Sequence, residues 1–366
     1  MPEPSTTRMR AYVVGQRSWT SLLWNAITSF DVSHGASIAE IPIPGINDSE
    51  VLVKVKAVAQ NPTDFKHIDM VSPPNSIVGC DFAGVVDQVG ANAPGNWKVG
   101  DRIAGVVHGG LHTDRGSYAQ YLKAEGDLAW KIPDSVTDQQ AATYGISAVT
   151  AMQGLYLNLD VPWPDENARS TPKELLVYAG STGASLFAIQ LAKLAGYRVV
   201  TTCSPHSFDL VKQYGADAAY DYHDDDTLAK IKAEFPNISG AFDGISAGQS
   251  TKICSQAIAG GRGKVITLGP GMKSSVKGVE VVSILMYTLL GRPFQLFAPL
   301  GPKWLTVPED RAALVRFYAM LPSLISRGLR SPPTKVVDGG FDGLRPGMDL
   351  LKAGKISGQK LIVNLS

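Results

Sequence analysis

The amino-acid sequence predicts an α/β protein built from two domains, one rich in β-strands and one with a doubly wound parallel sheet. The chain has 366 residues, and this length favours two domains over one. Between Gly79 and Gly110, closely spaced glycines separate short apolar runs, which is typical of tight turns in an antiparallel sheet or small barrel. From about Thr137 onward, strand-like and helix-like runs alternate, as they do in βαβ units.

The β-rich domain is expected to use both ends of the chain. Residues 51–56 place a Val at every second position, which predicts a half-buried strand. A last apolar strand is expected over residues 360–365, and the sheet of the first domain is its better host. We therefore assign residues 1–145 and 306–366 to the β-rich domain and residues 146–305 to the parallel-sheet domain.

The parallel-sheet domain is predicted element by element from the alternation of residue types. A run rich in Ala, Gln and Leu predicts a helix over residues 138–157 that leads into it. Strands are expected over residues 175–178, 198–203, 241–243 and 264–268. Helices are expected over residues 183–195, 208–214 and 251–258, with a later helix over residues 310–327.

Composition excludes several classes of protein. Hydrophobic residues make up 44% of the chain and charged residues 18%, which fits a folded protein with a sizeable core. The net charge of +1 lacks the basic excess of a nucleic-acid-binding protein. No apolar run reaches the roughly 20 residues of a membrane helix, and residues 1–10 do not resemble a secretory signal. Only Cys80, Cys203 and Cys254 are present, which indicates a reducing compartment, so we expect a cytoplasmic protein.

The segment over residues 175–185 carries the main chemical signal. A strand is followed by the small residues Gly180, Ser181, Thr182, Gly183 and Ala184 and then by a helix, which is how a pyrophosphate is bound at a helix N-terminus. The dinucleotide fingerprint expects glycine at positions 180, 182 and 185, and only the first obeys. A plain βα turn is the alternative, but the βαβ unit that follows favours a dinucleotide.

The end of the next strand predicts which dinucleotide is bound. It reads Ser204, Pro205, His206 and Ser207, without the carboxylate that would bind the ribose 2′-hydroxyl of NAD. Hydroxyl groups and an imidazole suit a 2′-phosphate, so we predict NADPH. Alternatively, or in addition, Ser207 caps the following helix.

Several motifs together resemble the medium-chain dehydrogenase/reductase superfamily, in its order and over nearly the whole chain. They are residues 61–64, 79–84, 99–102, 180–185 with 190–193, and 356–360. Three stretches resemble more narrowly the fungal trans-acting enoyl reductases of highly reducing polyketide synthase pathways, of the lovastatin-pathway type. These stretches are residues 61–66, 203–210 and 339–342, of which the Ser-Pro-His sequence at 204–206 is the most specific.

The resemblance implies a GroES-like β-rich catalytic domain joined to a Rossmann domain with a doubly wound parallel sheet. It implies NADPH-dependent reduction of an α,β-unsaturated acyl thioester that the acyl carrier domain of a partner polyketide synthase presents. It also implies that the protein is a monomer. Zinc-dependent members of the superfamily place Cys and Gly-His-Glu ligands where this chain has Asn61 and Cys80. Asn61 is a poor zinc ligand and Cys80 has no second thiol beside it, so we expect no metal.

The resemblance also implies roles for individual residues. The nicotinamide side would be lined by Thr63, Asp64, Phe65 and Lys66, with Ile356 and Ser357 closing over it. The pyrophosphate would be held by Ser181, Thr182, Gly183 and Ala184. The adenosine phosphate end would be held by Ser204, Pro205, His206, Ser207 and Tyr222. A strand would end at the cofactor with Leu268 and Gly269. The acyl chain would pass Ala148, Val149, Thr150, Ala151, Met152, Gln153, Gly154 and Leu155, and Met286, Tyr287, Thr288, Leu289 and Leu290.

One position departs from the family, which tends to have Thr where this chain has Ala148. A hydroxyl contact is then either lost or supplied by Ser147 or Thr150. In the expected reaction NADPH gives hydride to the β-carbon of the enoyl thioester, and the enolate is protonated at the α-carbon. Lys66 is the candidate enolate stabiliser or proton donor, unless it is a surface lysine or binds a cofactor phosphate.

Other interpretations stay open. Tyr144 or Tyr287 could supply the proton, and the apolar run over residues 281–290 either walls an acyl pocket or forms a dimer seam. The family resemblance favours the pocket. Lys273, Lys277, Arg292 and Lys303 either form a basic entrance for an acidic carrier domain or are solvated side chains. The competing functions are a zinc-free quinone or alkenal reductase acting on small diffusible substrates, and a nucleotide sensor without turnover.

Overall fold

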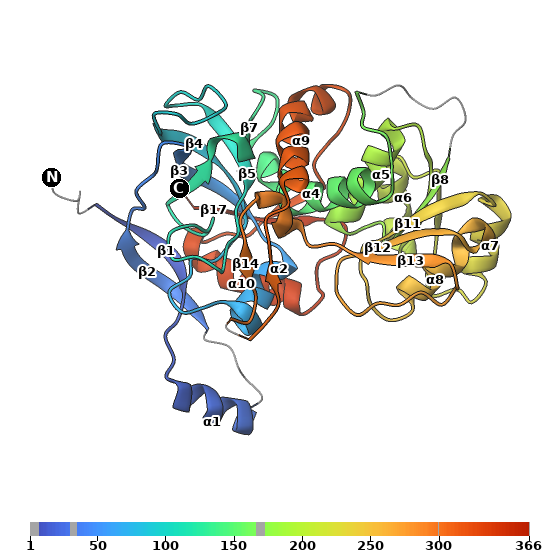
Figure 1. Ribbon diagram of the computed structural model, residues 1–366, viewed down its shortest axis with the longest axis horizontal. Coiled ribbons are helices and arrows are strands. Elements are labelled where there is room, and N and C mark those ends of the chain that lie inside the picture. The colour runs from blue at the N-terminus through green and yellow to red at the C-terminus, as the bar shows by residue number, and fades with distance from the viewer. Residues whose placement is uncertain (1–6, 30–34, 166–172, 299, 366) are drawn as a thin grey trace.

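The computed structural model describes residues 7–29, 35–165, 173–298 and 300–365. Its two larger sheets occupy opposite ends of an elongated molecule, and helices α4, α5 and α9 lie between them (Figure 1). One sheet is antiparallel for the most part and the other is entirely parallel, which confirms the predicted fold class. Among the described residues, every helix is too short or too polar to span a bilayer.

The β-rich lobe is built on a seven-stranded sheet that uses both ends of the chain. Val51, Val53 and Val55 of its central strand are buried and Lys54 is exposed, as the alternation predicts. The last strand pairs with this central strand, with Ile362 opposite Ala59, so its predicted host is confirmed. The order is β16 (Thr334–Val336), β17 (Lys360–Asn364), β3 (Glu50–Ala59), β4 (Asp81–Val89), β5 (Arg102–Val106) and β7 (Ala129–Lys131), with β6 (Tyr121–Glu125) paired to β3.

A second hairpin-like pair stands beside this sheet. Strands β1 (Arg8–Val14) and β2 (Ala36–Pro42) pair antiparallel, and helix α1 (Trp19–Ser29) lies in the connection between them. In Figure 1 this helix projects away from the body of the molecule. The sequence analysis assigned none of these three elements.

The other lobe holds a six-stranded parallel sheet, which confirms the predicted βαβ alternation. Strand β8 lies at its centre, and the chain winds outward from β8 in both directions. The carboxyl end of β8 is therefore the switch point at which open α/β sheets bind ligands. The order is β10 (Ala218–Tyr220), β9 (Arg198–Thr202), β8 (Glu174–Tyr178), β11 (Ile238–Asp243), β12 (Gly263–Thr267) and β13 (Val279–Ser283), connected through α5 (Gly183–Leu194), α6 (Phe208–Gln213), α7 (Thr227–Glu234) and α8 (Ser250–Ala257).

The apolar run over residues 281–290 is not one element, as the sequence analysis treated it. Its first part belongs to β13 at the edge of the parallel sheet, and its last part is a short 3₁₀ helix, Met286–Leu290. The two parts therefore present their apolar side chains to different surroundings.

The helix predicted over residues 138–157 is broken at Gly145. A Cβ atom at Gly145 would come within 2.1 Å of the Asp81 carboxylate, so close packing requires glycine there.

Three further helices complete the connections between and around the sheets. The elements are α3 (Asp138–Ala141), a 3₁₀ turn (Ala142–Tyr144), α4 (Ile146–Met152) and a π turn (Gln153–Asn158), then α9 (Pro308–Ser326), α10 (Leu344–Lys352) and the short α2 (Pro62–Lys66).

One hydrophobic cluster spans both lobes, and each lobe also has a core of its own. Trp130 from the β-rich lobe packs edge-on against Tyr144, which in turn contacts Phe187 of α5. All three side chains are buried in the same cluster, together with Leu321 of α9. The site between the lobes is therefore bordered by a packed core.

Candidate functional site

The loop after β8 is shaped by two close approaches. A Cβ atom at Gly180 would lie 2.0 Å from Thr201 Oγ1 on β9, and one at Gly183 would lie 2.8 Å from Ser147 Oγ. Ala179, just before them, adopts a left-handed conformation with φ of 58°. The loop therefore turns sharply at the switch point and leads directly into α5.

The two departures from the glycine fingerprint are accommodated by hydrogen bonds. Thr182 is the N-cap of α5, and its hydroxyl accepts from the backbone N–H of Ser185 at 3.2 Å. The buried Ser185 hydroxyl accepts from Thr182 and donates to the carbonyl of Tyr178 at 3.4 Å. Space for this hydroxyl comes from Gly244, where a Cβ would lie 2.0 Å from it. The glycine expected on the helix is thus replaced by a glycine after β11.

The N-terminus of α5 has the features that suit an anion. Thr182 satisfies only the third helical N–H, so the N–H groups of Gly183 and Ala184 have no helical acceptor. The helix has 12 residues and its dipole is positive at this end. On the far side of the switch point, a Cβ at Gly269 would meet no atom within 4 Å, so the region after Leu268 is open. Small residues, free N–H groups and open space fit the pyrophosphate of a dinucleotide.

The segment after β9 presents hydroxyl groups near the same edge of the sheet. The Ser204 hydroxyl donates to the hydroxyl of Tyr222 at 3.5 Å, and His206 is exposed. Neither Ser204 nor Ser207 caps a helix with its side chain, so the capping alternative is wrong.

Sequence analysis missed a carboxylate beside this segment. Asp221 follows β10, and its Oδ1 accepts from the backbone N–H of His223 at 3.0 Å and contacts the His223 Nδ1 at 2.8 Å. The hydrogen bond from the His223 backbone lowers the pKa of Asp221. The carboxylate lies after the third strand, outside the spacing at which the fingerprint seeks it.

In the segment expected on the nicotinamide side, residues 63–66, some side chains point into the protein and others toward the surface. Asp64 is buried, and its Oδ2 accepts from the Asn61 N–H and from the Tyr118 hydroxyl, each at 2.7 Å. Burial raises the pKa of Asp64 to about 7. Phe65 packs against the core of the β-rich lobe, whereas Lys66 is exposed and Thr63 half-buried. Thr63 and Lys66 therefore have the side chains best placed to meet a ligand.

A polar junction joins this segment to the dinucleotide loop. The Lys360 ammonium donates to Asn61 Oδ1 and, at 3.2 Å, to Ser147 Oγ. Asn61 also donates to Asp81 at 2.9 Å, and a Cβ at Gly183 would lie 4.0 Å from Lys360 Cδ. Burial lowers the pKa of Lys360 and raises that of Asp81, and the two groups lie 3.7 Å apart. The sequence named Lys360 only as part of a motif.

No group of three or more metal-binding side chains converges anywhere in the part of the chain that the structure describes. The residues at the zinc positions have other partners. Asn61 is bonded to Lys360, and Cys80 Sγ lies 3.7 Å from the Tyr287 hydroxyl. Burial raises the pKa of Cys80 well above its ordinary value, so it is a neutral thiol.

The last part of the apolar run meets the nicotinamide-side segment. The Tyr287 hydroxyl lies 2.6 Å from Thr63 Oγ1, and the Tyr287 ring stacks on His108 with 3.7 Å between centroids. Neither His67 nor His108 was singled out by the sequence, because the two lie 41 positions apart and no motif joins them. A cavity of about 20 Å³ opens beside these rings, room for about one water molecule. Its lining includes His108, His112, Tyr287, Leu290, Arg292 and Phe294.

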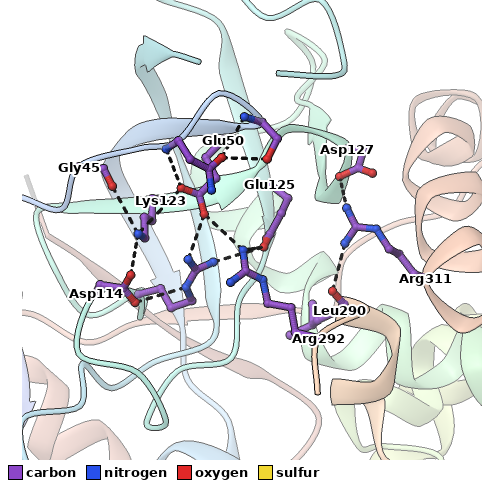
Figure 2. A network of polar contacts seen from close by, with 12 residues as sticks. Gly45, Glu50, Asp114, Lys123, Glu125, Asp127, Leu290, Arg292 and Arg311 are labelled. Carbon is purple, nitrogen blue, oxygen red and sulfur yellow. Dashed lines mark hydrogen bonds and ion pairs between the residues drawn. The ribbon is translucent and has the colours of Figure 1, made fainter. Parts of the chain in front are cut away.

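An ion-pair network borders this cavity (Figure 2). The fully buried Glu50 accepts from Arg115 at 3.0 Å and from Arg292 at 3.3 Å, and Glu125 contacts both arginines. Burial alone would raise the pKa of Glu50, but the Asn47 N–H and the Arg115 guanidinium outweigh it and lower the pKa. The sequence left open whether Arg292 belongs to a basic entrance or is a solvated side chain; in the structure it is paired with two carboxylates. Lys273, Lys277 and Lys303 are exposed.

The segments expected along the acyl chain lie mostly in the core. Ala148, Val149, Ala151, Met152 and Leu155 are fully buried there. The structure brings the two segments together where the Gln153 amide donates to Thr288 Oγ1 at 3.0 Å. Of these segments, only Tyr287 and Leu290 line the small cavity.

Three other candidate site residues, Tyr144, Ile356 and Ser357, lie outside the small cavity. The Tyr144 hydroxyl donates to the carbonyl of Leu329 at 3.2 Å within the core, so its proton is already used there. Ile356 is half-buried and Ser357 exposed, in the loop before β17. The next residue of that loop, Gly358, approaches Leu210 of α6, where a Cβ would lie at 2.7 Å.

Comparison with known proteins identifies the family. Residues 47–134 match the family model described as the alcohol dehydrogenase GroES-like domain, and residues 183–292 match that described as zinc-binding dehydrogenase. The chain is 36% identical over 338 residues to trans-enoyl reductase caaB of Aspergillus niger, covering 88% of this chain and 92% of the relative. It is 37% identical over 333 residues to trans-enoyl reductase ACTTS2 of Alternaria alternata, covering 90% and 95%.

Solved structures share the fold at lower identity. A putative zinc-dependent alcohol dehydrogenase protein from Rhizobium etli has a TM-score of 0.77 at 20% identity, covering 98% of each chain. A mycobacterial protein in complex with NADPH has a TM-score of 0.68 at 21% identity, covering 97% of this chain and 99% of the other. With the site geometry and the relatives at more than 30% identity, the chain belongs to the trans-enoyl reductases of the medium-chain dehydrogenase/reductase superfamily.

Proposed function

We propose that this protein is an NADPH-dependent, trans-acting enoyl reductase. It reduces the α,β-double bond of a polyketide acyl thioester that the acyl carrier domain of a partner polyketide synthase presents. Its relatives across most of the chain are named trans-enoyl reductases. The residues around the switch point of the parallel sheet fit a dinucleotide, which is the cofactor class this chemistry requires.

The observation that carries the proposal is the junction between Asn61, Lys360 and Ser147. It holds the segment of Thr63 and Lys66 against the lobe that carries the N-terminus of α5. One extended molecule can then contact both the phosphate-binding loop and the exposed side chain of Lys66. That is the requirement for a dinucleotide whose reactive end meets a second substrate.

The bound dinucleotide would supply the hydride. The protein's own residues would bind and orient the dinucleotide and stabilise the charge that develops on the substrate. The N–H groups of Gly183 and Ala184, with Ser181 and Thr182, would hold the pyrophosphate. Lys66 would face the thioester oxygen and stabilise the negative charge that develops on it. Leu268 and Gly269 would border the cofactor, and Ile356 and Ser357 would close over it.

We assign the 2′-phosphate of NADPH to Ser204, His206, Ser207 and Tyr222, with Pro205 shaping the turn. These side chains offer hydroxyl and imidazole donors near one edge of the sheet. Replacing both Ser204 and His206 by Ala should raise the KM for NADPH by about tenfold, the loss of one charged hydrogen bond, and leave the KM for NADH unchanged. Ser326→Ala, an exposed serine of α9, is the control. Equal effects on both cofactors would contradict the assignment.

The test of the function is NADPH oxidation by the purified protein with a short enoyl thioester, run beside a quinone. Turnover of the thioester, free or loaded on a carrier domain, and none of the quinone is the expected result. Turnover of the quinone alone would replace the proposal by a small-substrate quinone or alkenal reductase. NADPH binding with no turnover of any of these substrates would indicate a nucleotide sensor.

A further inference from the structure

A buried chain of polar side chains leads from Thr63 to the small cavity. Thr63 Oγ1 lies 2.6 Å from the Tyr287 hydroxyl and 3.1 Å from His67 Nδ1. His67 Nε2 lies 3.4 Å from His108 Nε2. His108 lines the cavity, and its ring stands edge-on to that of His112. The four linked side chains come from three distant segments of the sequence, so only the folded chain assembles them.

The positions of the hydrogen atoms along this row of side chains are worked out from the backbone carbonyl of Thr63, which can only accept a hydrogen bond. His67 Nδ1 lies 2.9 Å from the backbone carbonyl of Thr63, so Nδ1 carries a proton. Burial lowers the pKa of His67 to about 4, so the ring is neutral and its Nε2 accepts from His108. The Nδ1 proton also faces Thr63 Oγ1, and either the Thr63 or the Tyr287 hydroxyl can donate across the 2.6 Å between their oxygens.

In the arrangement that the relay uses, the Tyr287 hydroxyl accepts from Thr63 and keeps its own proton for another acceptor. The other atom near it is Cys80 Sγ at 3.7 Å, and a thiol sulfur is a weak acceptor. Burial raises the pKa of Tyr287 well above its ordinary value, so the proton stays on the oxygen until a strong base reaches it. An enolate beside Thr63 would be such a base.

We propose that Tyr287 donates the proton that completes the reduction and that a side-chain relay restores it. The relay runs from water in the cavity through His108, His67 and Thr63 to Tyr287. This assignment rests on the proposed enoyl reductase function and names its missing proton donor. It replaces Lys66 as the donor and leaves Lys66 the role of stabilising the enolate.

The proton balance closes without any further reactant than water. The enolate electron pair forms the new bond between the α-carbon and hydrogen as the Tyr287 O–H bond breaks. The tyrosinate takes the Thr63 hydroxyl proton, and Thr63 takes the Nδ1 proton of His67. His67 Nε2 receives the Nε2 proton of His108, whose other nitrogen takes one from water and leaves a hydroxide ion. Exchange of the ring protons with water then returns both histidines to their starting tautomers before the next turnover. The net result is one proton drawn from solvent per turnover.

Three variants separate donation from resupply. Tyr287→Phe keeps the ring stack on His108 and removes only the hydroxyl. His108→Phe keeps the same stack and removes the relay nitrogens. Tyr144→Phe is the matched control, because it removes another buried tyrosine hydroxyl that donates within the core. NADPH binding, followed by its fluorescence, shows that each variant retains a folded site.

The readout is product formed in the first and in later turnovers with an enoyl thioester, in H₂O and in D₂O. Tyr287→Phe should slow the first turnover by about 100-fold, the usual contribution of a positioned general acid, and reduce its solvent isotope effect. His108→Phe should leave the first turnover unchanged and slow those that follow. Tyr144→Phe should match the wild type.

Two outcomes would overturn the proposal in distinguishable ways. A first turnover in Tyr287→Phe equal to that in Tyr144→Phe, with the wild type active, removes the proton assignment and leaves the enoyl reductase function intact. A wild type that binds NADPH and turns over neither free nor carrier-bound thioester removes the proposed function, and this inference with it.

Discussion

Replacing Arg115 by Met should destabilise the β-rich lobe because it leaves a buried carboxylate without its main partner. Glu50 is fully buried, and Arg115 is 6% exposed and bonds to it at 3.0 Å. Breaking a buried pair of this kind costs about 3–5 kcal/mol. Arg292 remains at 3.3 Å and Lys123 at 3.9 Å, so we expect the lower limit, about 3 kcal/mol.

The assay is urea unfolding at pH 7, followed by tryptophan fluorescence, with two comparison variants. Lys193→Met breaks the half-exposed pair with Asp217 and should cost less than about 1 kcal/mol. Glu50→Gln combined with Arg115→Met should be more stable than Arg115→Met alone, because no unpaired charge stays buried. A loss in Arg115→Met no larger than that in Lys193→Met would refute the reasoning.

Acidity provides a second check on the same pair. The pKa of Glu50 is lowered in the folded protein, so its contribution to stability is present above the unfolded pKa of about 4.3 and is lost as the pH falls through the folded pKa. The difference in stability between wild type and Arg115→Met should therefore shrink in acid. A difference that stays constant down to the acid limit of folding would mean that Glu50 is not the group left unpaired.

Three further predictions concern the site. Gly180→Ala should cost about 1–3 kcal/mol and weaken NADPH binding, because its Cβ would meet Thr201 Oγ1 at 2.0 Å; urea unfolding and fluorescence titration measure the two effects. Gly45→Ala, which has open space around it and no positive φ, is the comparison for crowding. Asp64 has its pKa raised to about 7, so wild-type stability should fall as the pH rises from about 4 to about 7, and Asp64→Asn should flatten that dependence in urea unfolding across this range. Lys66→Met should lower the single-turnover rate by about 10-fold or more, since it removes a charge facing the developing enolate, and an unchanged rate would exclude that role.

The dinucleotide loop shows how far local sequence patterns reach. Strand β8, the small residues after it and helix α5 were all predicted, because apolar periodicity and helix-capping residues act over a few neighbours. The reason that Ser185 is tolerated was not predictable from these neighbours. It depends on Gly244, which another strand brings beside it.

The site beyond the loop depends on longer-range contacts still. Lys360 reaches Asn61 across 299 positions, and Tyr287 reaches Thr63 across 224. The sequence listed both partners of the second pair without pairing them, and it passed over His67 and His108. Two histidines 41 positions apart carry no periodic signal, so only the pairing of segments shows that they meet.

The sequence by itself determined the fold class and the strand, loop and helix in which we place the phosphate-binding site, since these follow from residue patterns a few positions long. Tertiary structure decided which polar groups share the interior. It divided residues 281–290 between a sheet edge and the Tyr287 turn, and it paired Arg292 with buried carboxylates. The physical reason is that burial forces each polar group to find a partner, and the chain's path through both lobes determines which partner is within reach.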